Sequence, residues 1–111
     1  MKRVNIPLYK THFFVTPYPS EVMHSSYRLT GYEVASDEFE GCNAMVIYGK
    51  DTNIVWMPST ATPDTVAHEA AHVAFNIMRM KGIQPDLNNQ EPMTYLIGFI
   101  AGAITKIKAK I

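Results

Sequence analysis

The sequence predicts a small α+β domain in which a mainly antiparallel β-sheet packs on one side against two long helices. The first half of the chain holds short β-prone runs separated by proline and glycine, and the second half holds two long helical patterns. Strands followed by helices are typical of α+β folds. Because 111 residues suit one hydrophobic core, we expect a single domain over residues 1–111.

The expected strands are short and rich in Val, Ile, Phe and Tyr, and they cover residues 3–8, 12–16, 43–49 and 53–58. The last two are joined by "KDT", which predicts an antiparallel hairpin. Residues 20–29 fit a short helix, although their apolar spacing follows the helical period only loosely. The acidic segment 30–41 contains two glycines, which favours a loop.

The first long helix has clear start and stop signals. Thr62 can cap it, Pro63 suits the first helical position, and Asp64 places a negative charge in the first turn. The pattern continues to about Lys81, and Gly82 supplies a left-handed stop. After a loop, a second helix is expected from Asn89 or Gln90 towards Lys108, with Pro92 in its first turn.

Composition excludes several classes of partner. Lys and Arg together number 10, as do Asp and Glu, so the formal net charge is zero and no broad surface for nucleic acid or membrane is expected. The longest apolar run, residues 93–104, is too short to span a bilayer, and the N-terminus lacks the apolar run of a secretory signal. The single cysteine, Cys42, suits a reducing compartment. These features indicate a cytoplasmic domain.

The sequence "HEAAH" at residues 68–72 is the strongest chemical signal. Histidines four residues apart lie on one face of a helix, one turn from each other, and can bind one metal ion. Glu69, the next residue after the first histidine, can reach a metal-bound water. Alternatively, the three residues are ordinary polar groups of an alanine-rich helix. The surrounding helix is largely apolar, so we expect them to be partly buried and to need partners. This favours one zinc ion per chain, held by His68 and His72.

A catalytic zinc usually has three protein ligands and one open position. Asp86, Glu91, His12 and His24 could supply the third ligand. Glu91 is favoured because it opens the second helix, and the preceding loop is long enough to double back. The resulting pattern is H-E-x-x-H-x18-E.

This pattern, from His68 to Glu91, resembles the gluzincin clan of zinc metallopeptidases. Short length, "HEAAHVAF" and "NNQEPMTYLIGFIAG" also resemble small predicted metallopeptidases of phage and prophage origin. The resemblance covers roughly residues 53–105. It implies a minimal zincin-like fold, with His68, His72 and Glu91 as zinc ligands and Glu69 as general base. Larger clan members have a second subdomain that walls the cleft, and this chain has no room for one.

The second helix carries Glu91, Tyr95, Gly98 and Gly102 on one continuous face. We expect the two glycines to let this face approach the alanine-rich side of the first helix, which would bring Glu91 within ligand reach. Tyr95 could then stabilise a developing oxyanion, or it is a half-buried tyrosine. Asn76, one turn past His72, is a candidate second partner for a histidine, or polar helix surface.

The expected function is zinc-dependent hydrolysis of peptide bonds, with a peptide or protein substrate laid along an exposed edge strand at residues 53–57. Glu69 would take a proton from the attacking water and pass it to the leaving amine. One alternative is a non-catalytic, zinc-stabilised protein-interaction module, such as a phage-encoded factor. Another is a metal-free structural domain.

Overall fold

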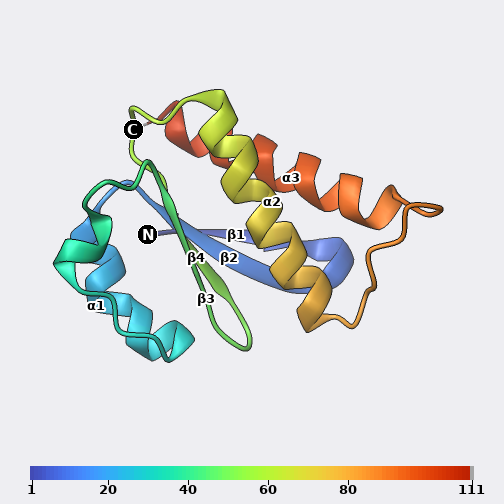
Figure 1. Cartoon of the computed structure of the whole chain (residues 1–111), viewed down its shortest axis with the longest axis horizontal. Coiled ribbons are helices and arrows are strands. Elements are labelled where there is room, and N and C mark those ends of the chain that lie inside the picture. The colour runs from blue at the N-terminus through green and yellow to red at the C-terminus, as the bar shows by residue number, and fades with distance from the viewer. Residues whose placement is uncertain (111) are drawn as a thin grey trace.

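The computed structural model describes residues 1–110 and shows an α+β domain. Its strands are β1 (Lys2–Ile6), β2 (Thr11–Thr16), β3 (Met45–Tyr48) and β4 (Asn53–Trp56). Its helices are α1 (Pro19–Thr30), α2 (Pro63–Met80) and α3 (Glu91–Lys108), with short 3-10 turns η1 (Pro7–Tyr9) and η2 (Ser36–Phe39). Figure 1 shows the sheet between α1 on one side and the α2–α3 pair on the other.

The four strands form one mixed sheet in the order β1-β2-β4-β3. The outer pairs, β1 with β2 and β3 with β4, are antiparallel, and the β3–β4 hairpin is as predicted. The central pair, β2 with β4, is parallel. Parallel neighbours need a long crossover, which here carries α1, η2 and β3. The sheet is therefore mixed rather than mainly antiparallel.

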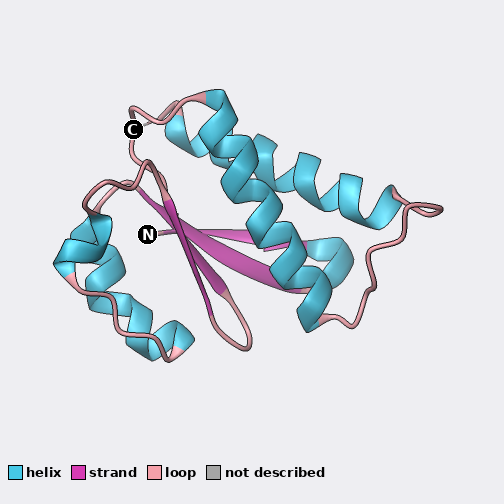
Figure 2. Ribbon diagram, viewed as in Figure 1, coloured by secondary structure: helices cyan, strands magenta, loops and turns pink. Residues whose placement is uncertain are grey.

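Helices cover both faces of the sheet (Figure 2), which corrects the expectation that they pack on one side. Side chains of β4 alternate between the faces. Ile54 and Trp56 join the core cluster under α1, whereas Val55 joins the larger cluster under α2 and α3. The helix predicted at residues 20–29 is confirmed as α1. Its weak apolar periodicity did not indicate that Val22 is fully buried against the sheet.

The boundaries of α2 agree with the predicted signals. Thr62 stands at the N-cap in an extended conformation, and Pro63 opens the helix. The Thr62 hydroxyl does not cap a backbone N–H, however, and contacts the side chains of Asp64 and Thr65 instead. At the other end Gly82 has a φ of +69°, which favours glycine. The N–H of Ile83 donates to the carbonyl of Met78 at 2.9 Å, so a carbonyl of the last turn is satisfied. Local sequence therefore fixes where α2 begins and ends.

The packing face of α3 differs from the predicted one. Its buried residues are Leu96, Ile100 and Ile104, which share one core cluster with Ala70, Ala74 and Ile77 of α2. Gly98 and Gly102 are exposed, and a side chain added at either would meet open space. Burial of a Leu or Ile side chain stabilises the fold by about 1.5–3 kcal/mol, a gain that glycine cannot match. The expectation that the glycine face approaches α2 is wrong.

The exposed side of α3 is polar in places, with Thr94, Thr105 and Lys106 open to solvent. Neither α3 nor any other helix within residues 1–110 combines the length and apolar content that a membrane span needs.

Candidate metal centre

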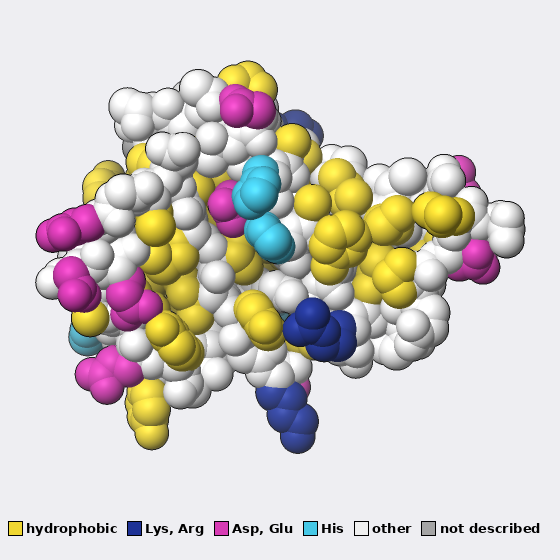
Figure 3. All heavy atoms as spheres, viewed as in Figure 1, with side chains coloured by type: hydrophobic (Ala, Val, Ile, Leu, Met, Phe, Trp, Pro, Cys, Tyr) yellow, Lys and Arg dark blue, Asp and Glu magenta, His cyan; other side chains and the backbone are white. Residues whose placement is uncertain are grey.

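His68 and His72 form a close pair on the outer surface of α2. Their Nε2 atoms are 3.2 Å apart, and their ring centroids are 4.8 Å apart in an edge-to-face arrangement. Zinc–nitrogen bonds of about 2.0–2.1 Å at a tetrahedral angle would hold two such nitrogens about 3.3–3.4 Å apart. Both side chains are exposed, which corrects the expectation that they are partly buried. The 3.2 Å contact is a hydrogen bond between the two rings, and its length is also close to the separation that one zinc ion would impose. Figure 3 shows histidine side chains open to solvent on this face.

Glu69 is placed differently from the histidines, because only 9% of it is exposed. Within residues 1–110, no hydrogen bond or ion pair involves its carboxylate. A hollow of about 430 Å³ is lined by Glu69 together with Asn43, Ala44, Asp64, Thr65 and His68. The carboxylate oxygens are not among the buried side-chain atoms without a partner, so solvent or a ligand in this hollow can reach them. The position of Glu69 beside His68 suits a base that acts on water at the histidine pair.

The histidine pair and the unpartnered carboxylate fit the ligand chemistry of zinc, but the structure brings no third ligand to them. Among residues 1–110, no group of three or more His, Cys, Asp or Glu side chains could hold a metal ion. From His72, α2 continues to Met80, a rise of about 12 Å, before the loop that leads to α3. Glu91 opens α3 beyond this loop and is exposed (Figure 1). It does not join the histidines in this arrangement.

The two candidate supporting residues have other neighbours. The amide nitrogen of Asn76 donates to Oδ1 of Asn53 at 2.9 Å, so Asn76 fastens α2 to β4 inside the core. Tyr95 lies with its ring centroid 6.2 Å from that of Tyr9 and 6.0 Å from that of Phe99. Asn76 therefore packs α2 against β4, and within residues 1–110 neither Asn76 nor Tyr95 is hydrogen-bonded to His68 or His72.

The strand beside the site is β3, not the predicted 53–57. Residues 53–56 form β4, which pairs with β2 on one side and β3 on the other and so has no free edge. β3 pairs only with β4 and forms an end of the sheet. Asn43 and Ala44, directly before β3, line the hollow that also holds Glu69. The hairpin pattern predicted β3 and β4. Only the parallel pairing of β4 with β2 shows that β3 is the edge strand.

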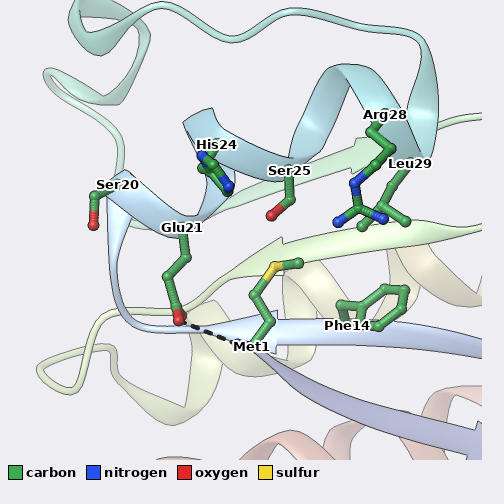
Figure 4. Close-up of a pocket in the computed structure, with 8 residues that line it drawn as sticks. All are labelled: Met1, Phe14, Ser20, Glu21, His24, Ser25, Arg28 and Leu29. Carbon is green, nitrogen blue, oxygen red and sulfur yellow. Dashed lines mark hydrogen bonds and ion pairs between the residues drawn. The ribbon is translucent and has the colours of Figure 1, made fainter.

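The other two histidines lie elsewhere. His12, on β2, has its pKa lowered by burial and by the nearby Arg3 guanidinium. His24, on α1, lines a separate hollow of about 580 Å³ (Figure 4). There the Glu21 carboxylate accepts a hydrogen bond from Thr16 and pairs with the terminal ammonium, which lowers its pKa. This hollow lies on the α1 side of the sheet, so it is not part of the candidate metal centre.

Comparisons with protein-family models, curated proteins and solved structures find no match to this chain.

Proposed function

We propose that this protein is a zinc-dependent peptidase whose metal is held by His68 and His72. One observation carries the proposal. The two Nε2 atoms stand 3.2 Å apart on an exposed helix face, and the neighbouring residue, Glu69, carries a carboxylate with no protein partner within residues 1–110 and lines the same hollow as His68. Helix geometry brings the three residues together, because they occupy two adjacent turns of α2.

The chemistry follows from the positions of these side chains. Zinc bound there would acidify a coordinated water and polarise a substrate carbonyl. Glu69 faces the same hollow as His68 and can accept the proton of the attacking water. The same carboxyl group can then protonate the leaving amine.

The substrate would be an extended polypeptide that adds to the free edge of β3. Backbone N–H and C=O groups along an unpaired strand edge are ready to pair with another chain. β3 ends the sheet, and the residues just before it line the hollow of Glu69. A strand paired along β3 would therefore pass the histidine pair.

Glu91 as the third ligand, which the resemblance to gluzincins implies, remains a prediction. In the observed arrangement Glu91 does not form a group with the histidines, so the first turn of α3 would have to move towards α2 for Glu91 to bind the same ion. The segment 84–90, which is exposed throughout, is the part of the chain that such a movement would rearrange.

The proposal is tested by comparing wild type with Glu69→Gln after both are purified in the presence of zinc. We expect about one zinc per chain in both proteins by elemental analysis. Cleavage of an unfolded protein substrate should fall by roughly 10²–10⁴-fold in the variant, the usual contribution of a general base. Glu40→Gln, which removes an exposed carboxylate outside the hollow, is the matched control and should cleave like wild type.

The outcomes separate the candidate functions. Zinc binding without any cleavage by wild type would favour the zinc-stabilised interaction module over the peptidase. A wild type that binds no zinc at a saturating concentration would overturn the metal site itself.

A further inference from the structure

We infer that the β3 edge is a substrate groove that selects a basic side chain, through Glu38, at a position a few residues from the scissile bond. This inference rests on the proposed peptidase function, since it names the substrate class of the same site. It is carried by the shape of the groove, the distribution of charge along it and the alternation of side chains on β3.

The groove follows the whole of β3. A hollow of about 610 Å³ is lined by Tyr32, Glu38, Met45, Val46, Ile47 and Tyr48. Asn43 and Ala44 then continue the same chain segment into the hollow of Glu69 and His68. At about 3.3 Å per residue, the distance from Ala44 to Tyr48 is about 13 Å. One extended peptide of four or five residues can therefore occupy both hollows.

The segment 33–40 beside the groove is acidic. It contains Glu33, Asp37, Glu38 and Glu40 and no Lys or Arg. Figure 3 shows acidic side chains gathered across a hydrophobic strip from histidine side chains on the same face. A peptide in the groove would pass between this acidic segment and α2.

Glu38 is the acidic residue that lines the groove, and its carboxylate is held in place. Its Oε2 accepts the backbone N–H of Ala35 at 2.7 Å, and its Oε1 accepts the hydroxyl of Tyr32 at 2.8 Å. These hydrogen bonds lower the pKa of Glu38, so the group is ionised at neutral pH. Each oxygen keeps a lone pair for a cationic partner. A fixed negative charge beside an apolar strand suits the aliphatic stem and charged end of Lys or Arg.

Alternation along the strand gives the position. Met45 and Ile47 belong to the cluster on the α1 side of the sheet, whereas Ala44 and Val46 belong to the cluster on the α2 side. Side chains of an added strand alternate in the same way. Those on the α1 side would face Glu38, and those on the α2 side would face the histidine turn. Because side chains on opposite faces are an odd number of residues apart, the selected basic residue lies an odd number of positions, such as three, from the residue that faces the histidine turn.

The far end of the groove carries the opposite charge. The Arg79 guanidinium lies 5.5 Å from the centre of the Tyr48 ring. Arg79 projects from α2, so it disfavours a cation on the α2 side of a bound peptide. The groove therefore distinguishes a peptide with one basic side chain on the Glu38 side from a uniformly basic peptide.

The test measures binding first, in a Glu69→Gln background that does not consume the peptide. Two labelled extended peptides are compared by fluorescence anisotropy, one with Lys at the selected position and one with Gln. We expect the Lys peptide to bind about three- to fivefold more tightly, as for a partly exposed ion pair. Glu38→Gln should remove this preference. Glu33→Gln, an exposed charge of the same segment that does not line the groove, should retain it.

Two further measurements make the result decisive. The Lys preference of the Glu69→Gln protein should shrink at high salt, a readout that does not depend on the folding of the Glu38 variant. Amide NMR signals of Val46 and Tyr48 should shift on peptide binding. Unshifted signals, or a Lys preference that survives Glu38→Gln, would overturn the inference. Binding with the expected preference but no cleavage by wild type would support the groove while overturning the peptidase.

Discussion

The sequence predicts that the middle turns of α2 and the first turn of α3 meet at one metal ion. In the structure the ligand-type residues of α2 lie together, but the one in the first turn of α3 lies apart from them. In α2, His68 and His72 stand at chelating distance with their Nε2 atoms 3.2 Å apart. In α3, Glu91 is exposed, and it joins no group of ligand-type side chains among residues 1–110. The two histidines therefore lie together, as the motif predicted, whereas Glu91 does not join them.

The difference shows which distances a sequence pattern fixes. The rise and turn of one α-helix set the separation of residues four apart, whatever surrounds the helix. The separation of residues on two helices depends on how the helices pack, and here large aliphatic side chains determine the packing. Leu96, Ile100 and Ile104 face the core, so the face with Glu91 turns away.

The largest effect is expected from His72→Ala. Removal of one of two paired imidazoles should lower zinc affinity by more than about 100-fold, because even residues that only support a ligand contribute 10–100-fold. Competition with a chromophoric chelator measures the change. An affinity close to that of wild type would show that the metal binds elsewhere. The contrast between α2 as the metal-binding helix and α3 would then be wrong.

Ile100→Ala tests the packing face of α3. Ile100 is fully buried between α3 and the core, so its truncation should destabilise the protein by about 2–5 kcal/mol. Urea unfolding followed by circular dichroism gives the free energy. A loss below about 1 kcal/mol would mean that α3 packs through another face.

Gly98→Ala tests the opposite face and should act in the opposite direction. Gly98 is exposed inside a helix, and a Cβ there meets open space. Alanine should therefore raise the free energy of unfolding by about 0.5–1 kcal/mol through helix propensity. Destabilisation in the same urea experiment would restore the close glycine contact with α2 that the sequence pattern had predicted.

The smallest effect is expected from Glu91→Gln. While Glu91 stays where the structure places it, zinc affinity should change by less than about threefold, within what a distant exposed charge contributes. The chelator competition used for His72→Ala provides the measurement. A loss as large as that of His72→Ala would instead show that zinc draws the first turn of α3 towards α2, with Glu91 as the third ligand.

Much of the fold could be predicted from local signals. The ends of α2 follow from Thr62, Pro63 and Gly82, and the β3–β4 hairpin follows from two β-prone runs joined by a short turn. The order of the strands could not be predicted. Pairing of Phe14 with Ile54 joins residues far apart in the chain, and no local pattern records such a contact.

In the candidate site, too, the sequence predicted the features that depend on one element and missed those that depend on contacts between elements. The motif predicted the histidine pair and its adjacent carboxylate, because all three depend on one helix. It did not predict the role of β3 as the edge strand or the position of Glu38 along it, because both depend on tertiary contacts. Asn76 was a candidate partner for a histidine, but it donates to Asn53 of the strand β4, and neither the helix pattern nor the strand pattern indicates that contact.

The parallel pairing of β2 with β4 also has a consequence for the order of folding. Each outer hairpin closes locally, whereas the central pair can form only after the whole segment from Pro17 to Thr52 has been looped out. Closing a loop of that length carries an entropy loss that no contact offsets until β2 and β4 meet. We therefore expect the β1–β2 and β3–β4 hairpins to form early. The pairing of β2 with β4 should form late and should limit the folding rate.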